Sequence, residues 1–385
     1  HLSIRRQRQM CIRDRFYEMT ELSKMRIPTI AVVFGSSTAG GAYQPGMSDY
    51  NIFIKEQSKV FLAGPPLVKM ATGEESDDET LGGAQMHSEV SGLSDYLAED
   101  EMDALRICRE VVSHLNWKKA EADPQVRSES PAYDSEDLLG LVSPDLKTPF
   151  DIKEAIARFV DGSRFEEFKP LFGPTIVTGW AEVHGYPVGI VANNGAIYPD
   201  SAQKAAHFIQ LCNKANTPII FLQNVTGFLV GKEFERDGIV KKGSQMINAV
   251  SNSTVPHITI ILGASYGAGT YAMSGRAFNN RFTFLWPSAK IAVMGGKQIA
   301  GVMSMVRRAR AMRKGEDFDE KQDKFITEAV EKLQDQGSLA LEATGLISDD
   351  GIIDPRDTRT VLGICLSVVG NKSIEGTEEY GVFRL

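Results

Sequence analysis

The chain has 385 residues, a formal net charge of -8, and 42% hydrophobic and 24% charged residues. This length exceeds the size at which one hydrophobic core usually stops growing, so it predicts two domains. The acidic balance disfavours nucleic acid and anionic membranes as partners, because both attract basic proteins. No apolar run approaches the roughly 18 to 20 residues that span a bilayer, so no transmembrane helix is expected.

The first fifteen residues, "HLSIRRQRQMCIRDR", differ from the rest of the chain because five of them are arginines. They form neither a secretory signal nor a convincing transit peptide. We interpret residues 1–15 as a foreign or artefactual junction, with a basic exposed helix as the alternative. Residues 16–25 are helix-like and lead into the first apolar strand.

The first apolar strand runs into a turn of small residues, in "IPTIAVVFGSSTAGGAY" at 27–43. A second strand ends in a glycine and two prolines, in "KVFLAGPP" at 59–66. Residues 98–115 predict an amphipathic helix, whose acidic start suits the positive end of the helix dipole. Its apolar positions at helical spacing are Met102, Leu105, Ile107 or Cys108, and Val112.

Residues 116–138 are polar, contain two prolines and lack apolar periodicity, so they predict a linker between two units. After the linker, two buried strands are expected at 187–193 and 217–223, joined by a helix at 200–216. A strand, a helix and a strand of these lengths predict a parallel crossover. Residues 307–334 form a long charged helical stretch, interpreted as a solvated helix or an oligomer contact.

The strand and turn at 27–43 have a second copy at 255–271, "VPHITIILGASYGAGTY", which aligns over seventeen residues without a gap. The stretch at 59–66 recurs in pattern as "KIAVMGGK" at 290–297, in the same order. The chain is therefore predicted to contain two copies of one α/β unit. The identical pairs are Pro28 and Pro256, Ile30 and Ile258, Gly35 and Gly263, Ser37 and Ser265, Gly41 and Gly269, and Tyr43 and Tyr271.

Glycines directly after a strand permit a positive φ and let the backbone approach a ligand closely. If a helix begins there, its first N–H groups lack a partner in the helix and can bind phosphate or stabilise an oxyanion. Neither turn has a P-loop or a dinucleotide-binding sequence, which disfavours a nucleotide site. Ser36 and Ser37 lack the context of a nucleophile and are interpreted as turn residues. Glycines that only pack a helix on a strand are an equal alternative.

Several long motifs resemble the carboxyltransferase subunit of biotin-dependent acyl-CoA carboxylases. "GSSTAGGAYQPGMSDY", "FLAGPPLVKMATGEE" and "SGLSDYLAEDE" are similar to its N-terminal half, and "FLQNVTGFLVG" and "GASYGAGTYAMSGRAF" to its C-terminal half. The resemblance runs from Phe16 to the end and is nearest to the methylcrotonyl-CoA carboxylase branch, with geranyl-CoA and other acyl-CoA carboxylases nearby. It implies that the chain lacks the beginning of the family's N-terminal half.

The resemblance implies an α/β fold of two crotonase-like (ClpP/crotonase, spiral ββα) domains related by internal duplication. The N-terminal carboxyltransferase domain would be 16–122, truncated at its start, and the C-terminal domain 123–385. Members of the family are enzymes that transfer a carboxyl group from carboxybiotin to an acyl-CoA, here 3-methylcrotonyl-CoA or a similar branched or unsaturated acyl-CoA, through an enolate. The thioester oxygen and the biotin ureido oxygen both become negative, so two donor sites are needed.

Carried over to this sequence, the N–H groups of Gly40 and Gly41 hold the thioester enolate, and those of Ala268 and Gly269 hold the ureido oxygen. In the family the base is biotin itself, so structural roles are implied for His87, His207 and His257. Three amides either orient the substrate or are buried at turns and strand ends: Asn194, Gln223 and Asn224. The substrate-binding residues implied are Thr38, Ala39, Tyr43, Gly64, Pro65, Tyr266, Gly267 and Tyr271.

The chain has no phosphate cradle for ATP and no M-K-M-type biotinylation site. The resemblance therefore implies carboxybiotin on a separate carrier, a partner biotin carboxylase and biotin carrier subunit, and no metal or nucleotide bound by this chain. It also implies hexameric rings, with the active site between the first domain of one protomer and the second domain of another. A reducing compartment, the bacterial cytoplasm or else the mitochondrial matrix, is indicated by four widely spaced cysteines: Cys11, Cys108, Cys212 and Cys365.

Two other functions stay open at this point. The first is a crotonase-type CoA hydratase, isomerase or decarboxylase that works without biotin. A carboxylate near the first turn would favour it, and "STAGGAYQPG" contains none. The second is an inactive fragment or scaffold, which the altered start of the chain favours.

Overall fold

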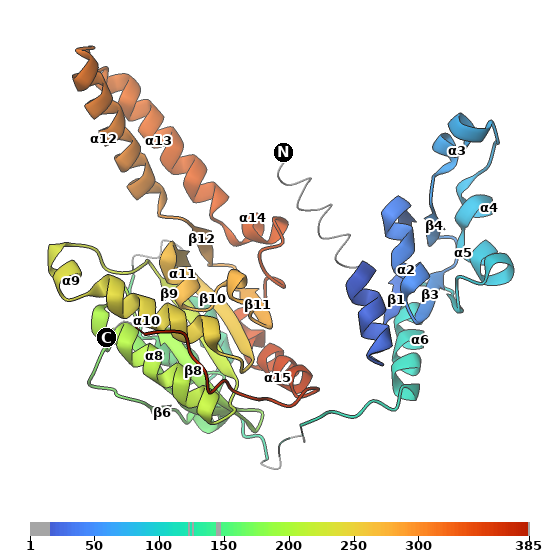
Figure 1. The fold of residues 1–385 in the computed structure, drawn as a ribbon, viewed down its shortest axis with the longest axis horizontal. Coiled ribbons are helices and arrows are strands. Elements are labelled where there is room, and N and C mark those ends of the chain that lie inside the picture. The colour runs from blue at the N-terminus through green and yellow to red at the C-terminus, as the bar shows by residue number, and fades with distance from the viewer. Residues whose placement is uncertain (1–15, 122–123, 125–126, 144–147, 384–385) are drawn as a thin grey trace. The chain divides into compact units, whose positions relative to one another are not determined.

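The structure is a computed structural model that describes residues 16–121, 124, 127–143 and 148–383. The chain divides into two compact units with the boundary between Lys118 and Lys119 (Figure 1). This boundary lies near the predicted one at 122/123, where residues 122 and 123 are outside the described part. The interpretation of residues 1–15 also falls outside the described residues.

The first unit begins with a helix at 16–24 and contains short strands and helices. Their bounds are β1 (Ile30–Val33), β2 (Ser36–Thr38), η1 (Ala39–Ala42), α2 (Tyr43–Met47), β3 (Tyr50–Ile54), β4 (Lys59–Phe61), α3 (Pro65–Thr72), α4 (Asp78–Gly82), α5 (Ala84–Met86), η2 (His87–Ser91), β5 (Tyr96–Ala98) and α6 (Glu101–His114).

Two small parallel sheets organise the first unit. One has the order β1-β3-β5, and Ile52 and Ile54 of its central strand pack on α6. The other joins β2 to β4, with Thr38 opposite Phe61. Because the strands are parallel, the turns that follow β2 and β4 lie at the same edge of this sheet.

The second unit contains the remaining elements of the described chain. Their bounds are η3 (Ser135–Gly140), α7 (Ile152–Ile156), η4 (Asp161–Ser163), β6 (Glu166–Glu167), β7 (Ile176–Val183), β8 (Tyr186–Asn193), α8 (Pro199–Lys214), β9 (Ile219–Val225), α9 (Lys232–Arg236), α10 (Ile239–Asn252), β10 (His257–Tyr266), α11 (Ala268–Ala272), η5 (Arg276–Phe278), β11 (Phe282–Leu285), β12 (Lys290–Ala292), α12 (Gly296–Lys314), α13 (Glu320–Gly337), α14 (Ala340–Gly345), η6 (Pro355–Asp357) and α15 (Thr358–Val369).

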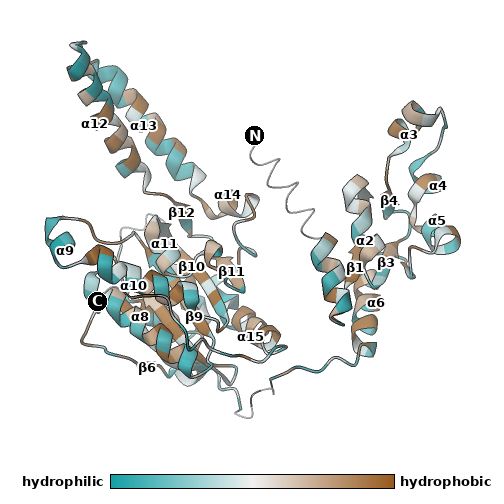
Figure 2. Ribbon diagram, in the orientation of Figure 1, coloured by the Kyte–Doolittle hydropathy of each residue, from teal (hydrophilic) through white to brown (hydrophobic). Residues whose placement is uncertain are grey.

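A seven-stranded sheet with the order β11-β10-β9-β8-β7-β6 forms the centre of the second unit, and β12 also pairs with β10. Strands β8 to β11 are parallel, which confirms the predicted crossover through α8. Helices α8 and α10 pack on one face of the sheet, and α7 and α15 on the other. The strands are hydrophobic along their length because both faces are covered (Figure 2).

The strand pairings repeat between the two units. Strand β2 pairs with β4 so that Ser37 lies opposite Val60. Strand β10 pairs with β12 so that Ser265 lies opposite Ile291. These are the partners that the alignment of the two sequence copies matches, and the parallel pair β1 and β3 likewise corresponds to β10 and β11. The internal duplication predicted from the sequence is present in the register of the strands.

The predicted apolar stripe of the helix before the linker was right at Ile107 and wrong at the other positions that are exposed. In α6 the buried residues are Ala104, Ile107 and Val111, while Met102 is 74% exposed and Val112 is 50% exposed. The sequence offers two apolar stripes on this helix. The sheet buries the one that contains Ala104, because a small residue lets a helix approach closely.

The stretch predicted as one long charged helix contains two helices. Helix α12 is followed by Gly315, whose φ of 65° is left-handed and ends the helix. Asp319 is the N-cap of α13, and its carboxylate accepts hydrogen bonds from two backbone N–H groups of the first turn. The two helices lie side by side and run in opposite directions (Figure 1). An ion pair of 2.7 Å between Arg307 and Asp323 joins them.

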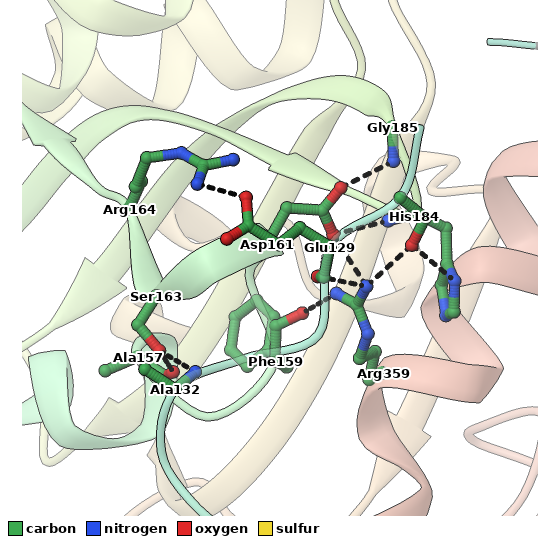
Figure 3. A network of polar contacts seen from close by, with 11 residues as sticks. Glu129, Ala132, Ala157, Phe159, Asp161, Ser163, Arg164, His184, Gly185 and Arg359 are labelled. Atoms are coloured by element: carbon green, nitrogen blue, oxygen red, sulfur yellow. Dashed lines mark hydrogen bonds and ion pairs between the residues drawn. The ribbon is translucent and has the colours of Figure 1, made fainter. Parts of the chain in front are cut away.

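A buried carboxylate fixes the turn between β7 and β8. Asp161 is 1% exposed, and its two oxygens accept hydrogen bonds from the backbone N–H groups of His184 and Gly185. The Arg359 guanidinium from α15 lies 2.7 Å from the same carboxylate and also donates to the Phe159 carbonyl (Figure 3). This network ties the hairpin to the helix that covers the sheet.

Replacing Asp161 with alanine should lower the free energy of unfolding by about 3 to 5 kcal/mol, because it leaves the Arg359 guanidinium, 15% exposed, without its carboxylate partner and the His184 and Gly185 N–H groups without their acceptors. Urea unfolding of the full chain measures this loss. The matched control is Asp137→Ala, which removes a carboxylate that is 59% exposed from its ion pair with Arg158. It should cost no more than about 1 kcal/mol. Equal losses in the two variants would contradict the importance of the network.

Candidate active site

The first candidate turn joins β2 to η1. Strand β2 ends at Thr38, and Ala39 then takes a left-handed conformation with a φ of 53°. Gly40 and Gly41 follow in the first turn of η1, which continues into α2. The left-handed residue redirects the chain from the strand into the helix, so Gly40 and Gly41 lie where backbone N–H groups lack regular partners.

The second candidate turn has the same construction at the end of β10. Gly267 has a φ of 59°, and its amide is occupied by a hydrogen bond of 3.1 Å to the Ala292 carbonyl of β12. Ala268 and Gly269 are the first two residues of α11. Because they lie in the first turn, their N–H groups have no acceptor within the helix, so α11 offers two adjacent donors.

The two glycines at these turns differ in their surroundings. A Cβ on Gly41 would meet only the Ser37 Oγ, at 2.9 Å, which is the end of a flexible side chain. A Cβ on Gly269 would lie 2.8 Å from Val225 Cγ2 and 3.2 Å from the Gly227 Cα. Gly269 therefore packs α11 on the end of β9 in addition to any donor role. The packing alternative does not account for Gly41.

The structure groups the predicted substrate-binding residues by unit. Thr38 and Ala39 lie at the end of β2, and Gly64 and Pro65 begin α3 just after the neighbouring β4. Tyr43 is 49% exposed at the start of α2.

In the second unit, Tyr266 and Gly267 end β10, and Tyr271 is 47% exposed on α11. Burial and the Asp335 carboxylate raise the pKa of Tyr266, so its hydroxyl stays protonated near neutral pH. Each unit thus gathers its own predicted residues at one sheet edge.

The amides left open by the sequence have partners within the protein. The Asn194 Oδ1 accepts from the Ile152 N–H, and the Asn224 Oδ1 accepts from the Ala264 N–H, each at 3.1 Å. Gln223 is fully buried and donates to the Met273 carbonyl at 2.7 Å. Because Gln223 is fully buried, the substrate-orienting alternative is wrong for this residue, whereas for Asn194 and Asn224 it stays a prediction.

The histidines expected to be structural are engaged with protein groups. One ring nitrogen of His87 lies 2.6 Å from the Val60 carbonyl. His207 Nδ1 lies 3.1 Å from the Lys169 Nζ. The ring nitrogens of His257 lie 2.9 Å from Ser274 Oγ and 2.8 Å from Ser253 Oγ.

Sequence reasoning missed two features of the site. The first is the left-handed conformation of Ala39, for which the aligned residue Gly267 in the second copy was the available signal. The second is the hydroxyl pair beneath α11, in which Ser265 Oγ and Thr270 Oγ1 lie 2.9 Å apart. The identity of Ser37 and Ser265 in the repeat pointed to the serine, but nothing in the sequence pointed to its partner.

The sequence matches the carboxyl transferase domain family over residues 11–381. The chain belongs to this family. The family, the crotonase-like α/β fold and the carboxyltransferase activity expected from the sequence are thereby confirmed, and the chain is an enzyme of this class.

Two relatives illustrate the family. The chain is 60% identical to a probable biotin-dependent acyl-coenzyme A carboxylase beta2 subunit of Mycobacterium tuberculosis, over 96% of this chain and 70% of the relative. It is 46% identical to the biotin-dependent 3-methylcrotonyl-coenzyme A carboxylase beta1 subunit of the same organism, with the same two coverages. The chain thus spans about seven tenths of the length of these relatives.

Two solved structures share the fold. The beta subunit of geranyl-CoA carboxylase from P. aeruginosa matches with a TM-score of 0.78 and 44% identity, over 95% of this chain and 69% of that chain. The transcarboxylase 12S structure, described as a hexamer assembly with hydrolysed methylmalonyl-coenzyme A bound, matches with a TM-score of 0.60 and 31% identity, over 96% and 71% of the two chains.

The described residues also bear on membrane insertion and metal binding. None of their helices is long and apolar enough to cross a membrane. Within the same part of the chain, no group of three or more histidine, cysteine, aspartate or glutamate side chains is placed to hold a metal ion.

His257 makes stability depend on pH. Burial lowers the pKa of this histidine to about 4 from a value of 6.5. The unfolded chain then binds a proton that the folded chain does not, so its contribution to stability is present above pH 6.5 and is lost as the pH falls toward 4. The free energy of unfolding should decrease by about 3 kcal/mol over this range through this group alone.

Urea unfolding at pH 7 and pH 4.5, for the original chain and for His257→Gln, measures this contribution. The variant should lose clearly less stability on acidification than the original chain. The same pH dependence in both proteins would show that His257 is not the group responsible.

Proposed function

We propose that this chain moves the carboxyl group of carboxybiotin, held on a separate carrier, to an acyl-CoA through an enolate. In this proposal the N–H groups of Gly40 and Gly41 hold the thioester oxygen, and those of Ala268 and Gly269 hold the biotin ureido oxygen. Carboxybiotin supplies the carboxyl group when it is bound. Each unit, 16–122 and 123–385, is taken as one crotonase-like domain with one donor turn.

The observation that carries the proposal is the duplicated turn. Ala39 and Gly267 have φ values of 53° and 59° at aligned positions, and each precedes the two residues assigned as donors. A developing oxyanion is stabilised by preorganised N–H groups, each worth about 3 to 4 kcal/mol in transition states elsewhere. The free first amides of α11 fit a ureido oxygen, because such an oxygen accepts two hydrogen bonds.

The substrate proposed is 3-methylcrotonyl-CoA or a similar branched or unsaturated acyl-CoA. Relatives named for 3-methylcrotonyl-CoA and geranyl-CoA, at 46% and 44% identity, support this class. The implied substrate-binding residues at each turn, including Tyr43 and Tyr271, remain part of the proposal.

The partners proposed are a biotin carboxylase and biotin carrier subunit and further copies of this chain. The names of the relatives as beta subunits of biotin-dependent carboxylases support the first, and the hexamer described for transcarboxylase 12S supports the second. We also propose that the protein works in a reducing compartment, which is the cytoplasm in a bacterium or the mitochondrial matrix in a eukaryote. The three described cysteines, Cys108, Cys212 and Cys365, are free thiols, which agrees with such a compartment.

The proposal is tested by mixing the full chain with a biotin carboxylase and biotin carrier, ATP, labelled bicarbonate and a panel of acyl-CoAs. Label should enter 3-methylcrotonyl-CoA or geranyl-CoA faster than propionyl-CoA, and only when biotin is present. Turnover of an enoyl-CoA without biotin would support the hydratase alternative instead. No carboxylation of any acyl-CoA would overturn the proposed activity for this chain.

Replacing Gly41 with alanine should lower kcat on the order of tenfold or more, because it adds a methyl group beside the proposed donor N–H groups, where a bound thioester must approach the backbone closely. The chain should stay folded, since only a side-chain end must move. Steady-state carboxylation and thermal unfolding measure the two effects.

The matched control is Gly46→Ala in α2, where a Cβ would have no neighbour within 4 Å. This variant should keep the original kcat. If Gly41→Ala also keeps it, the first turn is not the enolate site.

A further inference from the structure

Strands β9 and β10 separate just before the second donor turn. Their register places Ile261 opposite Gln223 and then Ser265 opposite Val225, so β10 has more residues than β9 across this stretch. Such a bulge leaves ladder groups without their regular partners and bends the strand. The bend directs β10 toward β12, with which its last three residues pair.

Two consecutive residues of β9, Gln223 and Asn224, make side-chain hydrogen bonds beside the bulge. Asn224 accepts a hydrogen bond from the Ala264 N–H, one of the groups that the bulge releases. Gln223 lies on the other face of the strand, the face covered by α11, and its side-chain amide donates to the Met273 carbonyl at 2.7 Å and the Thr270 carbonyl at 3.5 Å. These two carbonyls belong to the C-terminal end of α11 and its cap.

Two hydroxyl groups link the side chain of Gln223 to α11 by further hydrogen bonds. The Ser265 Oγ donates to the Gln223 Oε1 at 2.6 Å, and the Thr270 Oγ1 lies 2.9 Å from the same Ser265 Oγ. Gln223 and Ser265 are both 0% exposed. A closed polar network of this kind fixes a single geometry, because a buried group that loses its partner is costly.

We propose that Gln223 is a positioning residue that sets the orientation of α11, and with it the direction of the Ala268 and Gly269 N–H groups. This inference rests on the proposed function of the second turn. Helix α11 has five residues, which is too short to be stable in isolation. Gln223 holds its far end, while the pairing of β10 with β12 holds its near end. Because Gln223 is fully buried, it acts on the reaction through α11 and does not touch substrate.

The first turn lacks this device. Ala42 occupies the position that aligns with Thr270, so no hydroxyl is available there to continue a chain from Ser37. The polar support is therefore a property of the second turn, and its removal should affect the step that depends on α11 more than the binding of acyl-CoA at the first turn.

The test compares Gln223→Met, which has a similar volume and forms none of these hydrogen bonds, with the original chain. Carboxylation of 3-methylcrotonyl-CoA should show a kcat that is lower on the order of 10- to 100-fold, with the KM for the acyl-CoA within about twofold. Thr270→Val should show the same pattern in weaker form. Thr270→Ser keeps the hydroxyl and should restore kcat to within about twofold of the original chain.

Ile220→Val is the matched control, because Ile220 is a fully buried residue of the same strand that packs on the other face of the sheet. It should keep the original kcat. Hydrogen exchange gives a readout that does not need activity: the backbone amides of residues 268–273 should exchange faster in Gln223→Met, while those of α8 should not change.

The outcomes separate the two proposals. An unchanged kcat in Gln223→Met, or an equal loss in Ile220→Val, would overturn the positioning role. If the original chain transfers no carboxyl group, the proposed function fails, and the exchange of residues 268–273 alone decides whether Gln223 orients α11. Unchanged exchange in Gln223→Met would then overturn the inference.

Discussion

The left-handed residue after β2 and after β10 is the constraint on which both candidate sites depend. In both turns one residue with a positive φ leads the chain from the end of the strand into the helix that follows. Gly267 does this without steric cost, whereas Ala39, with a φ of 53°, carries roughly 1 to 3 kcal/mol of strain. The neighbouring strands β4 and β12 hold these turns in place through their parallel pairing.

The two turns share a positive φ at the aligned residue but differ in their surroundings. The second lies in a seven-stranded sheet that is covered on both faces, and Gln223, Ser265 and Thr270 link the sheet to α11 by hydrogen bonds. The first lies on a two-stranded sheet, and Thr38 and Ala39 are exposed. The two copies share the positive φ before the proposed donors, while the groups that support each turn differ.

Much of the fold followed from pattern alone. The gap-free alignment of 27–43 with 255–271 predicted two copies of one α/β unit, which the equivalent strand pairings confirm, and the crossover through α8 followed from the spacing of two apolar runs. The buried face of α6 was predicted only at Ile107, because the helix carries further apolar residues and the sheet decides which of them are covered. The break at Gly315 was also missed, since the charged pattern continues across it.

The sequence by itself determined the duplication, the family and the positions of the two small-residue turns, because these depend on the order of residue types along the chain. Only the tertiary structure decided what surrounds each turn. It showed that Gly269 is packed while Gly41 has room, and that Gln223 serves α11 rather than a ligand. These differences arise from contacts between residues that lie some forty or more positions apart, such as Gln223 with Ser265 and Met273, which local pattern does not encode.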